Sequence, residues 1–593
     1  MNGEAKVCQN CKAQFTIEAE DFKFYEKMQV PPPTWCPHCR YVRRLLNRNE
    51  WMLYRRKCDA TGEDIVSIYK LQAPFPVYKQ SAWWSDSWDP LSYGQEVDFS
   101  RPFFEQFYEL SLKVPHLAIV NSKSVNSEYT NQSEENKDCY MLAASGRNEK
   151  CMYSNWLQAG CYLVGDSYTL EKCELCYECM NCTRCHSSAY LHDSADCISC
   201  YFSMDLKGCS NCFGSIGLRS KKYCFFNAQL SKEDYEKRLS EMIWTREFID
   251  EMKKKAQEFS LKFPRKFYHG VKNRGSSGDY LEFTKDTAAS FNCRHDENVA
   301  YSQDSWYSKD SWDGTEIFAE LCYECQGSIV TRSIAVRSSW DTFDSYYSDM
   351  CFGSSNLFGC FSLRHKHYCI LNKQYKKEEY EKLKAKLIEH MKKTGEWGEY
   401  YPASISPFAY NESTAQDYFP LSKEEALAKG FTWYDRPERG YTITIYARDL
   451  PKTIDAVKDE IVKEVIQCDS QSSEEEKASH PICATAYAIT PLELELYRKM
   501  NLPLPKKCFP CRRQERFALR NPRALWHRGC MCQGRSSTNG VYKNTIEHFH
   551  KASHCPNEFE TSYPPSPKAT EGRGAPERQE VVYCERCYLA EVA

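Results

Sequence analysis

The sequence lacks any long uncharged apolar run, and nowhere approaches the ~18 to 20 such residues that a membrane-spanning helix needs. Its first residues reach Cys8 without an apolar segment, so we expect no export signal. It also lacks an excess of positive charge, because the formal net charge is -3. These absences exclude a membrane partner and a uniformly basic nucleic-acid coat, and they predict a protein of the reducing cytoplasm.

Cysteine is what the sequence has in excess, with 33 in 593 residues. That length corresponds to roughly three to five domains of ordinary size. In a reducing compartment, two cysteines separated by two residues indicate metal ligands before they indicate disulfides. The positions of the cysteines therefore have to be sorted into metal sites and other uses.

Two internal duplications organise the chain. Residues 8–58 align without a gap with residues 480–530, and the match includes five positions that can ligate metal: Cys8/His480, Cys11/Cys483, Cys36/Cys508, Cys39/Cys511 and Cys58/Cys530. Between them, Leu175–Cys179 recurs as Leu321–Cys325 and Leu218–Gln229 recurs as Leu363–Gln374. We call the outer copies A and A′ and the inner copies B and B′, in the chain order A, B, B′, A′.

Each inner copy has a finer repeat of about 12 residues, in which a small residue comes just before an aromatic one, as at Cys176, Cys200 and Cys212. A short repeat without helical periodicity is typical of a β-solenoid. The predicted fold is mainly β with α, with duplicated zinc-ribbon domains at both ends, two β-solenoid-like units between them, and connecting helices. The expected divisions are A (1–100), a helical connector (101–128), B (129–228), a second helical connector (229–268), B′ (269–372), a helix and extended linker (373–466) and A′ (467–593).

Three structural zinc sites are predicted at the two ends, because two C-x2-C turns present four sulfur ligands to one ion. The expected ligands are Cys8, Cys11, Cys36 and Cys39 in A, then His480, Cys483, Cys508 and Cys511 in A′, with Cys468 as a competing ligand. A third site in A′ would use Cys530 or Cys532 together with Cys555, Cys584 and Cys587. Its counterpart in A has Cys58, Thr61, Lys79 and Ala82, and we expect no metal there. Four protein ligands leave no open position for a substrate.

Two alternatives would make the protein an enzyme. His548 and His550, in an insert at 533–554, could hold the metal of a hydrolase. The cysteines at three-residue intervals from Cys173 to Cys185 resemble the start of an iron–sulfur or redox motif. In B′, however, small residues replace several of these cysteines, which favours stacking inside a solenoid and makes an iron–sulfur cluster unexpected.

Arginines follow the metal-ligand pairs of both outer copies at helical spacing. The candidate nucleic-acid contacts are Arg40, Arg44, Arg48 and Arg56 in A, and Arg512, Arg516, Arg520 and Arg528 in A′. Such a stripe beside tryptophans is typical of RNA or ribonucleoprotein binding. The alternative is that the arginines pair with acids of the B units, in a scaffold that contacts only protein. No small-molecule substrate is indicated.

Several motifs together also resemble a known type of sequence. They are Pro31–Arg40, Cys58–Gly62, Trp83–Pro90, Leu357–Cys360, Cys369–Tyr375 and His554–Tyr563. The chain resembles an uncharacterised multi-zinc-ribbon family of uncultured, genome-reduced bacteria. This resemblance implies zinc binding and a cytoplasmic bacterial protein, and it brings no established activity. We therefore expect a non-enzymatic protein that binds or assembles macromolecules.

Overall fold

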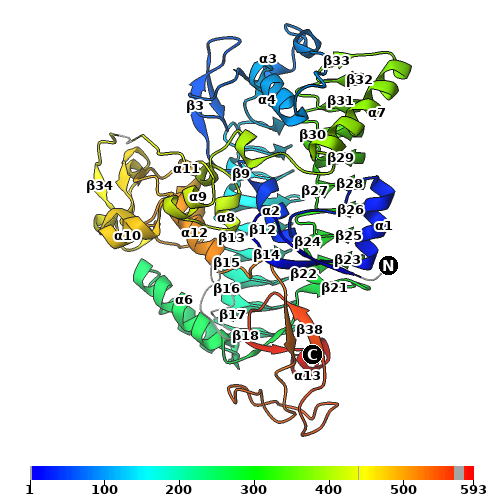
Figure 1. Cartoon of the computed structure of the whole chain (residues 1–593). Coiled ribbons are helices and arrows are strands. Elements are labelled where there is room, and N and C mark those ends of the chain that lie inside the picture. The colour runs from blue at the N-terminus through cyan, green and yellow to red at the C-terminus, as the bar shows by residue number, and fades with distance from the viewer. Residues whose placement is uncertain (1–2, 438–439, 566–579, 593) are drawn as a thin grey trace.

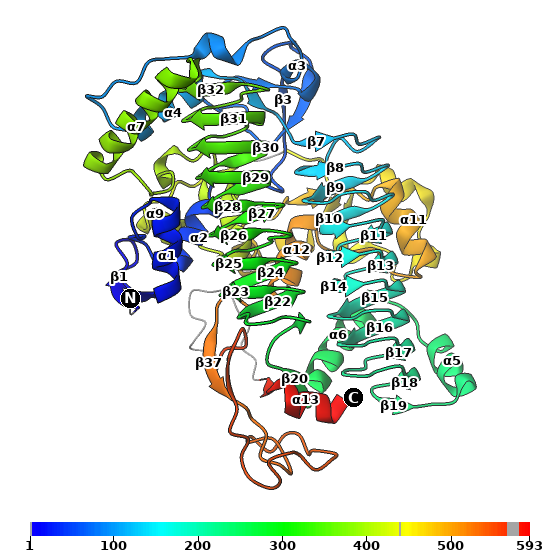
Figure 2. The same cartoon turned by 90° about the vertical axis from the view of Figure 1, so that its right-hand side faces the viewer.

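Two parallel β-stacks lie side by side at the centre of the molecule, with the helices and both terminal units packed around them (Figures 1 and 2). The computed structural model describes residues 3–437, 440–565 and 580–592. The first stack runs in the opposite direction to the second along their common axis (Figure 2). The mainly β fold with a solenoid-like centre is as predicted.

The first stack is built from strands that pair in parallel with the strand one coil further on, as Cys200 does with Cys212. It ends in an antiparallel hairpin, in which Cys224 pairs with Gln229. Its strands are β7 (Asn121–Ser122), β8 (Ser133–Glu134), β9 (Tyr140–Ala143), β10 (Met152–Gln158), β11 (Tyr162–Gly165), β12 (Tyr168–Glu171), β13 (Glu174–Tyr177), β14 (Met180–Thr183), β15 (His186–His192), β16 (Ile198–Met204), β17 (Ser210–Phe213), β18 (Lys222–Phe225) and β19 (Ala228–Gln229).

The second stack repeats this plan and also closes with an antiparallel hairpin, in which Cys369 pairs with Gln374. Its strands are β21 (Gly270–Val271), β22 (Gly278–Glu282), β23 (Lys285–Ala288), β24 (Ser290–Arg294), β25 (Glu297–Ala300), β26 (Lys309–Trp312), β27 (Thr315–Ile317), β28 (Glu320–Tyr323), β29 (Gln326–Ile334), β30 (Arg337–Tyr346), β31 (Phe352–Phe358), β32 (His367–Ile370) and β33 (Lys373–Gln374). The two inner copies are therefore two copies of one solenoid.

The coils turn because about every third residue has a left-handed backbone conformation. In one coil, Leu175, Glu178 and Asn181 have φ of 51°, 48° and 52°. The residues that follow the first two of them, Cys176 and Cys179, are fully buried in the stack. A left-handed conformation costs a non-glycine residue roughly 1–2 kcal/mol, so other interactions must offset this strain.

Hydrogen bonds between coils provide that compensation. The Ser188 hydroxyl oxygen accepts a bond from the Cys200 backbone N–H at 3.1 Å, across 12 residues. The Cys176 thiol donates to the Cys185 carbonyl at 3.6 Å. Small side chains with a polar atom, Ser and Cys above all, therefore suit the interior. The repeat of about 12 residues and its explanation by stacking are confirmed.

The outer copies share the same order of elements, a helix, a second helix and an antiparallel hairpin. In A these and the neighbouring elements are β1 (Glu4–Val7), β2 (Gln14–Ile17), α1 (Ala19–Met28), α2 (Pro37–Leu45), β3 (Tyr54–Lys57), β4 (Asp64–Ser67), β5 (Val77–Tyr78), α3 (Gln80–Trp83), η1 (Pro90–Tyr93) and β6 (His116–Leu117). In A′ they are β35 (Ile466–Gln467), η7 (Asp469–Gln471), α10 (Glu474–Ser479), β36 (Ala486–Tyr487), α11 (Pro491–Lys499), α12 (Phe509–Ala518), β37 (Trp526–Gly529), β38 (Glu558–Thr561), β39 (Val581–Tyr583) and α13 (Glu585–Val592).

The connecting segments cover the sides and ends of the stacks. They contain α4 (Phe103–Lys113), α5 (Lys232–Ser240), α6 (Arg246–Ser260), β20 (Pro264–Lys266), α7 (Lys377–Thr394), η2 (Ala403–Ile405), η3 (Tyr410–Glu412), α8 (Ala415–Tyr418), α9 (Lys423–Ala428), β34 (Ile445–Tyr446), η4 (Ala447–Asp449), η5 (Ile454–Ala456) and η6 (Asp459–Lys463). No helix in the described ranges is long and apolar enough to cross a membrane.

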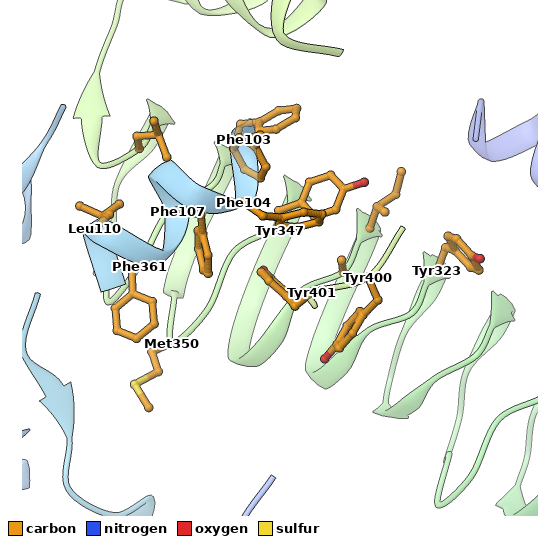
Figure 3. Close-up of a cluster of buried hydrophobic side chains, with 14 of the residues drawn as sticks. Phe103, Phe104, Phe107, Leu110, Tyr323, Tyr347, Met350, Phe361, Tyr400 and Tyr401 are labelled. Atoms are coloured by element: carbon orange, nitrogen blue, oxygen red, sulfur yellow. The ribbon is translucent and has the colours of Figure 1, made fainter. Parts of the chain in front are cut away.

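The main hydrophobic core lies between helix α4 and the second stack, where α4 directs Phe103, Phe104 and Phe107 toward Tyr347 and Tyr401 (Figure 3). The ring centroids of Phe103 and Tyr347 are 5.5 Å apart, and those of Phe107 and Tyr401 are 5.1 Å apart. Aromatic packing outside the stack therefore complements the interior of small and aliphatic side chains within it.

Candidate metal centres

The first group of four thiols joins the hairpin of β1 and β2 to the start of helix α2. Cys8 and Cys11 come from the turn of the hairpin, while Cys36 is the N-cap residue of α2 and Cys39 lies in its first turn. The four sulfur atoms lie within 4.8 Å of one another, and those of Cys11 and Cys36 are 3.8 Å apart. Two sulfurs bound to one tetrahedral zinc at about 2.3 Å would lie about 3.8 Å apart. The predicted set is therefore brought together with a spacing that can hold a metal ion.

In this group the surroundings of Cys36 favour the thiolate, the form that binds metal, whereas burial and the neighbouring thiols raise the pKa of Cys11 and of Cys39. The hydrogen bond with Cys39 and further donors lower the pKa of Cys36 to about 5, although burial opposes the shift. The Cys36 backbone N–H also donates to the Cys8 sulfur at 3.2 Å. The start of a helix adds a positive partial charge beside these sulfurs.

In the second group, one ligand differs from the predicted set. Cys483, Cys508 and Cys511 come together as expected, but the fourth member is Cys468 and not His480. The Cys468 and Cys511 sulfurs are 3.9 Å apart, and those of Cys483 and Cys508 are 3.8 Å apart.

A backbone contact explains why Cys468 and not His480 belongs to this group. The Cys468 N–H donates to the Thr485 carbonyl at 2.9 Å, next to the pairing of β35 with β36. This contact brings a residue from outside the duplicated segment to the cluster. His480 instead lies beside Glu476 and Glu515, each with a carboxylate oxygen 3.6 Å from an imidazole nitrogen. Of the two candidates for the fourth position, Cys468 and not His480 therefore lies in the group.

The third group lies at the C-terminal end and consists of Cys530, Cys555, Cys584 and Cys587. All four are buried. The Cys555 sulfur is 3.9 Å from that of Cys584 and 3.7 Å from that of Cys587. The structure thus selects Cys530 for this group, while Cys532 lies in a neighbouring group with His548, His550 and Cys587.

At the matching place in A, Cys58 has different neighbours. The backbone N–H of Lys79 donates to the Cys58 sulfur at 3.3 Å, and the Lys79 side chain pairs with Glu63 at 2.5 Å. A lysine therefore occupies the position that Cys584 has in A′.

The cysteines of the inner stacks serve a different purpose. The thiols from Cys173 to Cys185 donate to backbone carbonyls of their own and the next coil, as Cys182 does to Leu191 at 3.3 Å. In the part of the chain that the structure describes, these five thiols are not grouped closely enough to share an ion. The structure also shows an inner group that the sequence did not predict. In this group, buried Glu316 lies with Cys322 and Cys325.

The arginines of A do not form a surface stripe. Arg40 and Arg44 are 1% and 0% exposed and both pair with Asp313 of the second stack, at 2.8 and 3.0 Å. Arg43, between them, pairs with Glu324 at 3.0 Å. We call this set the A clamp.

The arginines of A′ repeat the arrangement on the other stack. Arg512 and Arg516 both pair with Asp166, at 3.0 and 2.8 Å, and all three side chains are buried. Arg513 pairs with Asp417 at 2.8 Å. We call this set the A′ clamp.

The remaining candidate arginines also contact the chain itself. Arg48 pairs with Glu50, Arg56 with Asp59, Arg520 donates to the Asp417 carbonyl and Arg528 to the Tyr563 carbonyl. All eight arginines thus make contacts within the chain, and the buried ones, Arg40, Arg44, Arg56, Arg512 and Arg516, do not form the solvent-facing stripe that nucleic-acid contact would need. Helical spacing predicts which arginines share a face, and it does not say whether that face meets solvent or protein.

Comparisons with known proteins add little to this geometry. No protein-family model and no curated protein matches the chain. One solved structure that matches in part is a "putative acetyltransferase" from Desulfovibrio desulfuricans G20, with 13% identity and a TM-score of 0.10. The match covers 40% of this chain and 61% of the other. At that TM-score the likeness supports no conclusion about function.

Proposed function

We propose that the protein is a non-enzymatic assembly protein, in which zinc ions stabilise the terminal units and buried arginines attach these units to a double β-stack that binds a protein partner. The observation that carries this proposal is the direction of the arginines, since both clamps face inward. They attach the terminal units to the stacks, and they leave the arginines of α2 and α12 no solvent-facing stripe for phosphates.

The metal groups support the same proposal. Each of the three groups consists of four sulfur ligands, the set that structural zinc sites favour, and a full set leaves no position for a reacting water. A cavity of about 150 Å³ near Arg513 and Phe517 is smaller than the ~300 Å³ at which ordinary small-molecule sites begin. Zinc in these groups would act on the fold and not on a substrate.

The surface that we assign to the partner is an aromatic ladder on the second stack, defined by Phe283, His295, Tyr307 and Phe318. All four side chains are exposed. Successive ring centroids lie 4.9, 4.7 and 5.1 Å apart with nearly parallel planes. Exposed aromatic residues are frequent anchors of protein interfaces.

The ladder suits a protein better than a nucleic acid. A base stacks on an open ring face, whereas here each inner ring face is covered by the next ring and only the edges face outward. Charges beside the ladder are of both signs, and Lys285 pairs with Glu297 at 2.6 Å. Neither feature provides a path for a phosphate backbone.

The test is capture of a partner by the tagged full-length chain in its own cells, after treatment with nuclease. We expect a protein that is retained by the wild type and lost from Tyr307→Ser/Phe318→Ser. The matched control is Ile198→Ser, which removes an apolar side chain, 52% exposed, from the first stack. Loss of the partner on nuclease treatment, or equal capture by the ladder variant, would contradict the proposal. Metal analysis should give at least three zinc ions and no iron per chain.

A further inference from the structure

The C-terminal unit brings a second set of ligand atoms next to the third group of thiols. Cys532, His548, His550 and Cys587 each place one ligand atom within 4.8 Å of the others, and Cys587 belongs to both sets. We propose that the Cys587 sulfur bridges two metal ions, so that this unit holds a two-metal centre and the chain a fourth zinc. The proposal rests on the zinc in the third group that the proposed function assumes.

His548 is prepared as a metal ligand by its neighbours. Its Nε2 atom lies 2.8 Å from a carboxylate oxygen of Glu591, and both side chains are completely buried. Glu591 is itself held by Tyr542 at 2.7 Å and by the Thr545 backbone N–H at 2.9 Å. A carboxylate behind an imidazole is the usual second partner of a histidine that binds zinc.

The other nitrogen of His548 has no protein partner. Nδ1 is buried and makes no hydrogen bond in the structure. Because the Glu591 carboxylate accepts the proton of Nε2, the lone pair of Nδ1 is free to bind an ion. A buried polar nitrogen without a partner is rare in folded proteins, and a metal ion at this point would satisfy it.

His550 is oriented in the same way but with its nitrogens reversed. Nδ1 lies 2.7 Å from the Ser553 carbonyl oxygen, which can only accept, so Nδ1 carries the proton. Nε2 then has the lone pair and lies 3.4 Å from the Cys587 sulfur. Nitrogen and sulfur bound to one tetrahedral zinc would lie about 3.6 Å apart.

Cys532 completes the set and is also held in place. Asn544 donates from its side chain to the Cys532 sulfur at 3.1 Å, and the Tyr583 hydroxyl donates to the Asn544 carbonyl oxygen at 2.8 Å. The second set thus has two sulfur and two nitrogen ligands, and Cys532, His548 and His550 each have a supporting contact. Two dications among five thiolates would leave one negative charge, which the N–H groups that donate to these sulfurs reduce.

This arrangement gives the 533–554 insert a structural task. The insert begins after Cys532 and ends before Cys555, whose N–H donates to the Cys532 carbonyl at 2.9 Å. The two-metal centre would therefore close the loop at its base and fix its histidines inside. Both ions would have four protein ligands, so the centre has no open position for the water of a hydrolase.

Native mass spectrometry of the full-length chain tests the inference by counting zinc. We expect four zinc ions in the wild type, three in Cys532→Ser and in His550→Ala, and at most two in Cys587→Ser, because Cys587 serves both ions. Cys58→Ser, which removes a buried thiol at the matching place in A, is the control and should keep four.

The possible results separate the two proposals. Three zinc ions in the wild type, unchanged by Cys532→Ser, would overturn the fourth site and leave the proposed function standing. Fewer than three would overturn the zinc sites on which the proposed function depends. If the variants fail to fold, NMR of the wild type loaded with ¹¹³Cd tests the bridge. Two cadmium ions that share a sulfur give a pair of mutually coupled signals. Four uncoupled signals would refute the bridge.

Discussion

Asp313 joins the N-terminal unit to the second β-stack through two arginines, and its replacement by alanine tests that attachment. Its carboxylate accepts hydrogen bonds from Arg40 at 2.8 and 3.0 Å and from Arg44 at 3.0 Å, and none of the three side chains is more than 1% exposed. Removing one member of a buried ion pair typically costs about 3–5 kcal/mol, because the remaining charge stays buried without its partner. Glu324 is 4.0 Å from Arg40 and would compensate only in part.

Hydrogen exchange of helix α2, measured by mass spectrometry, reports the cost directly. If α2 exchanges by local opening, a cost of about 3–5 kcal/mol corresponds to exchange faster by roughly 10²- to 10⁴-fold. Asp344→Ala is the matched control, because it breaks an exposed Arg–Asp pair with Arg332 in the same stack and should cost at most about 1 kcal/mol. If Asp313→Ala changed the exchange of α2 no more than Asp344→Ala changes that of β30, the clamp would not hold the unit in place.

Three further predictions concern metal, pH and the stack interior. Removal of zinc by a chelator should expose both terminal units to limited proteolysis while the stacks stay resistant, and cleavage that begins within the stacks would contradict this. Burial raises the pKa of Asp296 to about 7, so the folded state binds the proton more tightly than the unfolded chain does, and the contribution of this carboxyl to stability should fall as the pH rises from about 4 to 7. Asp296→Asn should remove that fall, as measured by thermal unfolding at pH 5 and pH 8. Cys200→Ser should change stability by no more than about 1 kcal/mol in denaturant and leave the zinc count unchanged, since Ser345 has the matching place in the second stack, whereas Cys508→Ser should lose one zinc.

The parts of the structure that depend on local spacing could be predicted from the sequence. A coil of 12 residues brings Cys200 beside Cys212, so one repeat is enough to show the stack. Two residues between Cys36 and Cys39 fit one helical turn, which makes them a ligand pair wherever the helix lies. The duplication also tested the iron–sulfur alternative, because a serine at the matching position of the sister copy could not serve as a ligand of such a cluster.

The parts that depend on long-range contacts could not be predicted. Arg40 lies 273 residues from Asp313 in the sequence, and Arg512 lies 346 residues from Asp166. A signal was nevertheless present, since both acids stand shortly before the Leu-Cys-Tyr-Glu-Cys motif of their copy. Cys468 could be named from the sequence only as a competing ligand, because it lies outside the segment that matches A and reaches its cluster through strand pairing.

The two clamps constrain the order in which the parts of the chain can fold. A attaches to the second stack and A′ to the first, so in the order A, B, B′, A′ the two attachments interleave. No cut between the stacks leaves either clamp complete, because residues 1–268 contain Arg40 and Asp166 without their partners.

The thiols of the first metal group, by contrast, all lie within one short segment and can bind an ion before either stack exists. Because long loops make distant contacts slow to form, we expect the first metal group to form early and the clamps to close last. Pulse-labelling hydrogen exchange during refolding with zinc should then protect β1 before the last turn of α2, which carries Arg43 and Arg44, and simultaneous protection of both would refute this order.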